Sequence, residues 1–193
     1  MKTSVNSATR PLILRKGFTL VELLVVIAII ATLAALITAG VTTAIRKARL
    51  LEAKNDCVGL VSAVDNFYAD HNYLPMTPGA AEAPATTDTA EGVYMLEALT
   101  RRGNGAAANT KGTDYFNAKV SEVGKRGLIV SGNNVQSLLD PFGRPYQFIM
   151  DADLDNRILD PNTTTPIAAR ILVWSFGVEG QTSPQQDWVY SWK

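Results

Sequence analysis

The sequence predicts an α+β protein in which one long N-terminal helix carries a small antiparallel sheet. Three observations support this prediction. The segment from Phe18 to Ile45 is apolar apart from Glu22, an amphipathic helical pattern continues to about Asp70, and several short strand patterns follow. One early helix followed by a run of strands is typical of α+β domains. We therefore expect the first half of the helix to span a membrane and the second half to pack on the sheet.

The apolar segment of residues 18–45 is long enough to cross a bilayer. It has 28 residues, whereas a helix needs about 20 to span the hydrocarbon core. Glu22 is its only charged residue. A carboxylate in hydrocarbon costs about 3 kcal/mol on insertion scales, and more when no cation is near it. Glu22 is therefore a candidate functional residue that needs a cationic partner.

The helical pattern continues past the apolar segment as an amphipathic stretch. Its apolar positions recur at spacings of 7, 4, 3 and 4, namely Leu50, Cys57, Val61, Val64 and Tyr68. This spacing predicts one buried face of a helix. The pattern ends near residues 70–72, and the proline at position 75 prevents an easy continuation.

The remainder of the chain predicts a loop, a short helix and strands. Residues 76–92 are rich in Pro, Ala, Thr and Gly, which is typical of an exposed loop, and residues 93–99 have a short helical pattern. Short apolar runs between Asn, Asp, Pro and Gly clusters predict strands at residues 128–130, 146–150, 171–176 and 188–192.

Composition limits the classes of function. Residues 1–17 contain four basic residues and no acidic one, which leaves 14 basic and 18 acidic residues in the other 176. The resulting net charge of about −4 argues against nucleic-acid binding. Cys57 is the only cysteine and His71 the only histidine, so no intrachain disulfide can form and the sequence indicates no Ser-His-Asp set. A membrane-anchored enzyme is therefore a poor alternative.

The sequence at the start of the apolar segment is Lys16-Gly17-Phe18-Thr19-Leu20-Val21-Glu22. It closely resembles the class III leader of type IV pilins and pseudopilins, which a prepilin peptidase cuts after the glycine. The resemblance implies that residues 1–17 are a cleaved leader, that Phe18 becomes the N-methylated terminus, and that Glu22 is the acid used in assembly. The alternative, a generic signal anchor, gives no reason for Gly, Phe and Glu at these offsets. A secretory signal does not fit, because it is cut after its apolar region.

Two later segments resemble the major pseudopilin of type II secretion, where the corresponding turn reads Asp-Pro-Trp-Gly-Asn-Pro-Tyr. They are Asp140-Pro141-Phe142-Gly143-Arg144-Pro145-Tyr146 and Ser175-Phe176-Gly177-Val178-Glu179-Gly180. The second is similar to a closing loop that binds calcium in that family, which implies Glu179 and Asp187 as ligands. The alternative is a metal-free loop closed by packing of Trp188 and Trp192. Residues 76–138 match no motif of the family.

A second acidic stretch alternates along residues 151–155. Asp151, Asp153 and Asp155 resemble the start of an EF-hand loop, but Asn156 and Asn162 stand where that loop has Gly and Glu. We expect a hairpin turn between two strands here rather than a calcium loop.

The resemblance implies a single-pass protein of the bacterial inner membrane, with a cytoplasmic N-terminus and residues 46–193 in the periplasm. The processed subunit would form a helical homo-oligomeric pseudopilus that drives protein export. Its further partners would be the inner-membrane assembly platform, minor pseudopilins and a secretin. A type IV or competence pilin is the alternative, which the turn at residues 140–146 and the lack of a C-terminal cysteine pair disfavour.

Overall fold

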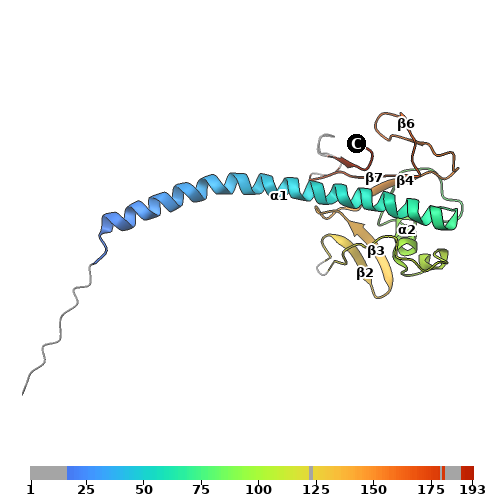
Figure 1. Ribbon diagram of the computed structural model, residues 1–193, viewed down its shortest axis with the longest axis horizontal. Coiled ribbons are helices and arrows are strands. Elements are labelled where there is room, and N and C mark those ends of the chain that lie inside the picture. The colour runs from blue at the N-terminus through green and yellow to red at the C-terminus, as the bar shows by residue number, and fades with distance from the viewer. Residues whose placement is uncertain (1–16, 122–123, 179, 181–187) are drawn as a thin grey trace, which may run out of the picture. The chain divides into compact units, whose positions relative to one another are not determined.

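The computed structural model describes residues 17–121, 124–178, 180 and 188–193, with the backbone alone for residues 36–39. All of the predicted leader except Gly17 therefore lies outside the described residues. The chain divides into two compact units, Met1–Ala44 and Ile45–Lys193. Helix α1 (Leu20–His71) contributes residues to both units, which confirms the predicted long N-terminal helix (Figure 1).

The first unit exposes apolar side chains along α1. Phe18 is 76% exposed, Leu20 is 80% exposed and Val21 is 68% exposed. Among the described residues, α1 is the one helix long and apolar enough to cross a membrane. A helix that is apolar on all sides needs lipid or other helices around it.

The second unit is built on the amphipathic part of α1, which buries one face. The buried residues recur at spacings of 4, 3, 4 and 3, namely Ala53, Cys57, Leu60, Val64 and Phe67. The predicted helical period is therefore confirmed. The predicted buried face, however, is rotated about the helix axis from the face that the structure buries. Val61 and Tyr68 are only partly buried and pack at the margin of the core.

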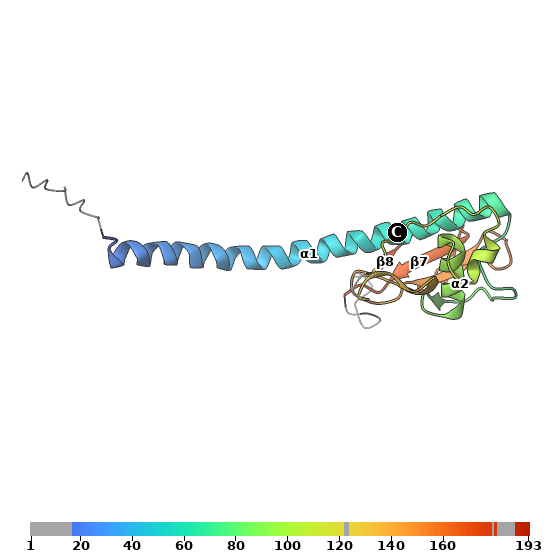
Figure 2. The same cartoon turned by 90° about the horizontal axis from the view of Figure 1, so that it is seen from below.

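The main sheet confirms the predicted α+β class. It is antiparallel with the order β1-β4-β7-β8, and the part of α1 in the second unit shares a core with it (Figure 2). Its strands are β1 (Ala85–Thr86), β4 (Gln147–Met150), β7 (Ile171–Ser175) and β8 (Val189–Tyr190).

Strands β4 and β7 alternate between two apolar clusters, as side chains of successive strand residues point to opposite faces. Phe148 and Val173 join α1 in the main core. Ile149, Leu172 and Trp174 belong to a second cluster on the other face. The sheet is therefore covered on both faces, which explains why all five residues of β7 are buried.

Two further strand pairs complete the second unit. The predicted strand at residues 128–130 is β2 (Gly127–Ser131), which pairs with β3 (Asn134–Leu139). Gly132 has a φ of 62° in the two-residue connection, as tight hairpins often require. Strand β5 (Ile158–Leu159) pairs with β6 (Pro166–Ile167). Strands β1, β3, β5 and β6 were not predicted from the sequence.

The predicted short helix is present as α2 (Ala90–Thr100), followed by a 3-10 helix, η1 (Gly105–Ala108). The predicted loop over residues 76–92 is wrong at its end, since it contains β1 and the first turn of α2. Thr89 caps α2 by accepting the N–H of Gly92 at 3.3 Å. Gly92 is needed for packing, because a Cβ there would overlap the Thr86 carbonyl of β1.

Candidate functional site

The N-terminal segment of residues 17–22 brings Thr19 and Glu22 together at the start of α1. The Glu22 carboxylate accepts the Thr19 N–H at 2.9 Å and the Thr19 hydroxyl at 2.8 Å. In return, Thr19 Oγ1 accepts the Glu22 N–H at 3.2 Å. These reciprocal bonds form a capping box, which satisfies N–H groups that would otherwise be free at a helix start. The Thr-x-x-Glu spacing is the sequence signal from which this box could have been predicted.

Gly17 has no packing role in the described part of the chain. No described atom lies within 4 Å of the position that a Cβ would take, and its φ is not positive. A larger residue at position 17 is therefore compatible with the folded chain. Cleavage between Gly17 and Phe18 stays a prediction, as does the assembly role of Glu22.

The predicted calcium ligands Glu179 and Asp187 lie outside the described residues, so calcium stays a prediction. The start of their loop is held by Arg144. Its Nη1 donates to the carbonyl oxygens of Gly177 and Val178, at 2.6 Å each. A guanidinium therefore already pairs with two carbonyl groups of this loop.

Asp140 joins the turn before β4 to the same loop. It is fully buried and accepts the N–H groups of Phe142 and Arg144 at 2.9 Å each and the Ser175 hydroxyl at 2.5 Å. Ser175 Oγ in turn accepts the Gly177 N–H at 3.0 Å. Burial raises the pKa of Asp140, and the bond from Ser175 opposes that increase.

The structure shows part of the alternative prediction, in which packing of Trp188 and Trp192 closes the loop. The rings of Trp188 and Phe176 lie 4.6 Å apart, and those of Trp192 and Trp174 lie 6.0 Å apart. These contacts fix residues 188–192 against the second cluster. They do not test whether calcium binds at Glu179 and Asp187.

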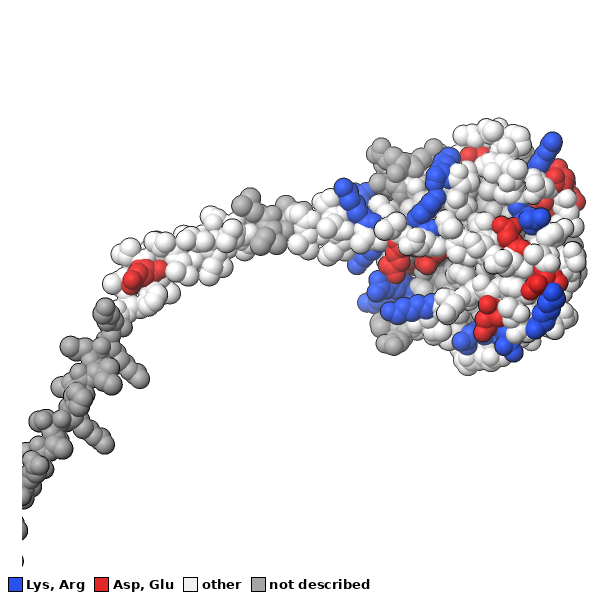
Figure 3. All heavy atoms as spheres, in the orientation of Figure 1, with Lys and Arg blue, Asp and Glu red and all other residues white. Residues whose placement is uncertain are grey.

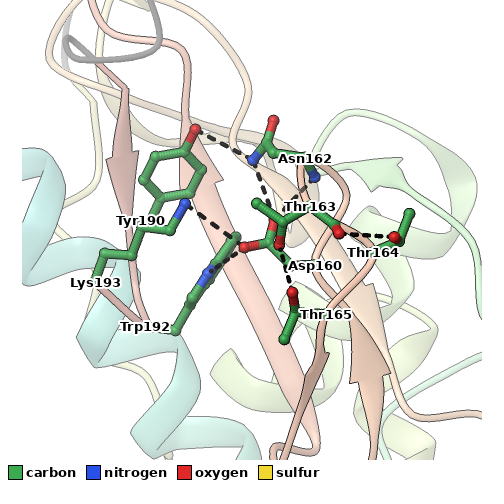
Figure 4. Close-up of polar contacts among 8 residues, drawn as sticks. All are labelled: Asp160, Asn162, Thr163, Thr164, Thr165, Tyr190, Trp192 and Lys193. Carbon is green, nitrogen blue, oxygen red and sulfur yellow. Dashed lines mark hydrogen bonds and ion pairs between the residues drawn. The ribbon is translucent and has the colours of Figure 1, made fainter.

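Asp160 adds a polar anchor for the same C-terminal residues (Figure 4). Its carboxylate accepts the Asn162 N–H at 2.8 Å and the Trp192 indole N–H at 3.2 Å. Lys193 Nζ lies 3.6 Å from it, and the Asn162 amide donates to the Tyr190 hydroxyl at 3.2 Å. The β5–β6 connection thus holds residues 190–193 in place.

The acidic stretch of residues 151–155 does not form the predicted hairpin turn. It connects β4 to β5, whereas β4 pairs with β1 and β7, and β5 pairs with β6. Asp151 accepts the N–H groups of Asp155 and Asn156 at 3.2 and 2.8 Å. Residues 151–156 therefore form a tight turn, but the chain then continues into the separate β5–β6 pair and does not return along β4.

Glu82 lies beside this stretch, which sequence reasoning missed. Within the part of the chain that the structure describes, Glu82, Asp151 and Asp153 are the one acidic group that could hold a metal ion, with ligand atoms within 4.8 Å of one another. Burial raises the pKa of Glu82, and the nearby Asp153 carboxylate adds to the increase. In the absence of a cation, these carboxylates repel one another.

Cys57 and His71 do not form a catalytic set with other described side chains. Cys57 is fully buried in the main core, and this burial raises the pKa of its thiol. His71 stacks on Phe67 with ring centroids 4.3 Å apart, and its Nε2 lies 3.2 Å from the Tyr115 hydroxyl. Both side chains therefore contribute to packing in the described part of the chain.

Comparison with known proteins gives three kinds of relative. Residues 14–38 match a family model described as the prokaryotic N-terminal methylation motif. The chain is 33% identical to the fimbrial protein EcpC of Eikenella corrodens over 58% of this chain and 67% of that protein. It is 32% identical to the type II secretion system core protein G of Escherichia coli (strain K12) over 61% of this chain and 81% of that protein. It is also 32% identical to the type IV major pilin protein PilE1 of Neisseria gonorrhoeae, over 58% of this chain and 61% of that protein. No solved structure matches the chain.

Proposed function

The chain belongs to the type IV pilin and pseudopilin family, and from this premise we propose that it is the pseudopilus subunit of a type II secretion system. It is a structural subunit and not an enzyme. We infer that a prepilin peptidase cuts after Gly17 and that Phe18 is then N-methylated. The processed subunit waits in the bacterial inner membrane with residues 46–193 in the periplasm, and it then assembles into a filament that drives export.

The observation that carries the choice of a secretion pseudopilus is the extent of the similarity. The match spans similar shares of this chain, 61% and 58%, but it makes up 81% of core protein G and only 61% of PilE1, at the same identity of 32%. The turn at residues 140–146 supports the same choice. A type IV pilin is the second candidate, favoured by the 33% identity to EcpC.

In the proposed assembly step, Glu22 changes partners. Before assembly its carboxylate is held by Thr19 of its own helix, at 2.9 and 2.8 Å. Cleavage creates a positive amine on Phe18, and a neighbouring subunit in the filament would offer that amine to Glu22. A buried ion pair that loses one partner costs about 3–5 kcal/mol, so this contact would decide whether a subunit docks.

The test deletes the gene for this protein in its host and reintroduces wild-type or variant copies. We expect exported proteins to disappear from the culture medium while surface pili persist. Restored Glu22→Ala should insert and be cut after Gly17, yet form no filament when overproduced. Glu52→Ala is the matched control, because Glu52 is an exposed acid of the same helix beyond the apolar segment, and its ion pair with Arg126 at 3.6 Å is also exposed to solvent. It should restore both filaments and export.

Three outcomes would contradict these proposals. Loss of surface pili with normal export would favour the pilin over the pseudopilus. Normal filaments from Glu22→Ala would show that Glu22 is not the docking group. Absence of filaments from the wild-type chain with all partners present would favour a plain membrane anchor.

A further inference from the structure

A group of exposed basic residues occurs at the start of the second unit. Three of them follow the apolar segment on α1, and three come from the segment that leads into β2. We call these six residues the basic collar: Arg46, Lys47, Arg49, Lys119, Lys125 and Arg126. Figure 3 shows Lys and Arg side chains gathered around the α1 residues that open the second unit.

The two parts of the collar meet in one open groove. Arg49 lines this groove together with Lys119, Lys125 and Arg126, around a cavity of about 1160 Å³. The described acids of the groove already have partners. Glu52 pairs with Arg126 at 3.6 Å, and Asp56 accepts the Tyr146 hydroxyl at 2.7 Å. The groove therefore presents an excess of positive charge to whatever enters it.

The position of the collar along α1 places it at the level of lipid headgroups. Arg46 directly follows the last apolar residue, Ile45, and Arg49 comes four residues after it. At 1.5 Å per residue, Arg49 is about 6 Å along the helix from Ile45, the last residue of the apolar segment. The headgroup region on each side of a bilayer is about 5–7 Å thick. Lys119, Lys125 and Arg126 line the same groove as Arg49, and charges act over about 8–10 Å at physiological salt.

We propose that the basic collar binds the phosphate groups of anionic phospholipids while the subunit is stored in the membrane. Guanidinium groups bind phosphate in a bidentate manner, and lysines add point charges. The proposal rests on the membrane anchorage in the proposed function, but it does not depend on the choice between pseudopilus and pilus. The rest of the chain carries a net negative charge and would repel anionic lipids, so the proposal assigns their binding to the collar.

The test uses the full chain purified in detergent. The protein is incubated with equal amounts of phosphatidylglycerol and phosphatidylcholine that carry the same acyl chains, and native mass spectrometry counts the lipids retained. We expect phosphatidylglycerol to be retained in preference. A variant with Lys119, Lys125 and Arg126 changed to Gln should lose most of this preference. Each basic residue near a membrane surface is worth up to about a fivefold change in the ratio.

A matched control carries the same change in charge away from the collar. Arg101, Lys111 and Arg157 are exposed, and their change to Gln should leave the preference intact. Circular dichroism checks that each variant folds, and the pair Arg46→Gln and Lys47→Gln tests the collar on α1 without touching the groove.

Each result distinguishes the proposal from its alternatives. Equal retention of the two lipids by the wild-type chain would overturn it. Equal loss in the collar and control variants would show an effect of net charge and would also overturn it. Equal retention of the two lipids, together with inorganic phosphate that is retained by the wild-type chain and not by the Gln variant of the groove, would assign the groove to free phosphate. Filament and export assays on the same variants are separate, so failure here leaves the proposed function intact.

Discussion

Arg144→Ala tests whether the guanidinium holds the loop after β7. The side chain is half-buried and makes two charged hydrogen bonds to the Gly177 and Val178 carbonyls at 2.6 Å. Such bonds contribute about 1.5–3 kcal/mol each when they are shielded from water, and partial exposure to solvent reduces each of these two to about 1 kcal/mol. We expect the free energy of unfolding to fall by about 2 kcal/mol. In a domain of this size, that loss lowers the melting temperature by about 4–8 °C.

The assay is reversible thermal and urea unfolding of a soluble form that lacks residues 1–45. Arg144→Lys keeps the positive charge, but its shorter side chain does not place a donor where Nη1 contacts both carbonyl oxygens, so its stability should lie between those of the wild type and Arg144→Ala. Arg157→Ala removes an exposed arginine and should change the stability by less than about 0.5 kcal/mol. If Arg144→Ala also stays within about 0.5 kcal/mol of the wild type, the two hydrogen bonds of Arg144 contribute nothing to stability and the reasoning is wrong.

Three further predictions use the same soluble form. Calcium should raise its melting temperature, and Glu179→Ala and Asp187→Ala should each abolish that increase, since a ligand of the folded state alone stabilises it by mass action; identical melting in calcium and in chelator would contradict the metal proposal. Because the pKa of Glu82 is raised, the folded state binds the proton of this carboxyl more tightly than the unfolded chain does. The resulting contribution to stability is present below the ordinary pKa of 4.5 and is lost as the pH rises through the pKa of the folded state. Glu82→Gln should therefore increase stability at neutral pH in chelator and make no gain at acidic pH, and a loss at neutral pH would refute the repulsion. Asp140→Ala leaves two N–H groups and the Ser175 hydroxyl without their acceptor and should cost about 3 kcal/mol or more, measured by urea unfolding, whereas a cost below about 1 kcal/mol would mean that water replaces the carboxylate.

The sequence predicted the elements that carry strong local signals. The uncharged run after Glu22 and the helical spacing that ends at Tyr68 extend over many turns, so α1 was predicted with its end near His71. Strands β4 and β7 are apolar and bounded by turn residues. By contrast, β1, β5 and β6 have two residues each, and only their pairing partners define them. The Gly132-Asn133 turn was a usable signal for β3, but Gln136 and Ser137 obscured its apolar pattern.

The candidate site divides in the same way. The Thr19–Glu22 box is local and could have been predicted, because its two residues are three positions apart. The contact of Glu82 with Asp151, and that of Arg144 with Gly177, join segments that only the folded sheet brings together. No spacing rule in a single sequence links residues so far apart along the chain.

The burial of Cys57 makes the chain convenient for mapping neighbours in a filament. Its thiol is enclosed in the core and resists deprotonation, so water-soluble reagents and mild oxidants do not reach it in the folded protein. A cysteine introduced at an exposed position of α1, such as Leu51 or Val58, would be the single reactive thiol. Disulfides formed between two such variants in one cell would then identify which helix faces adjoin, without removal of any native residue from the core.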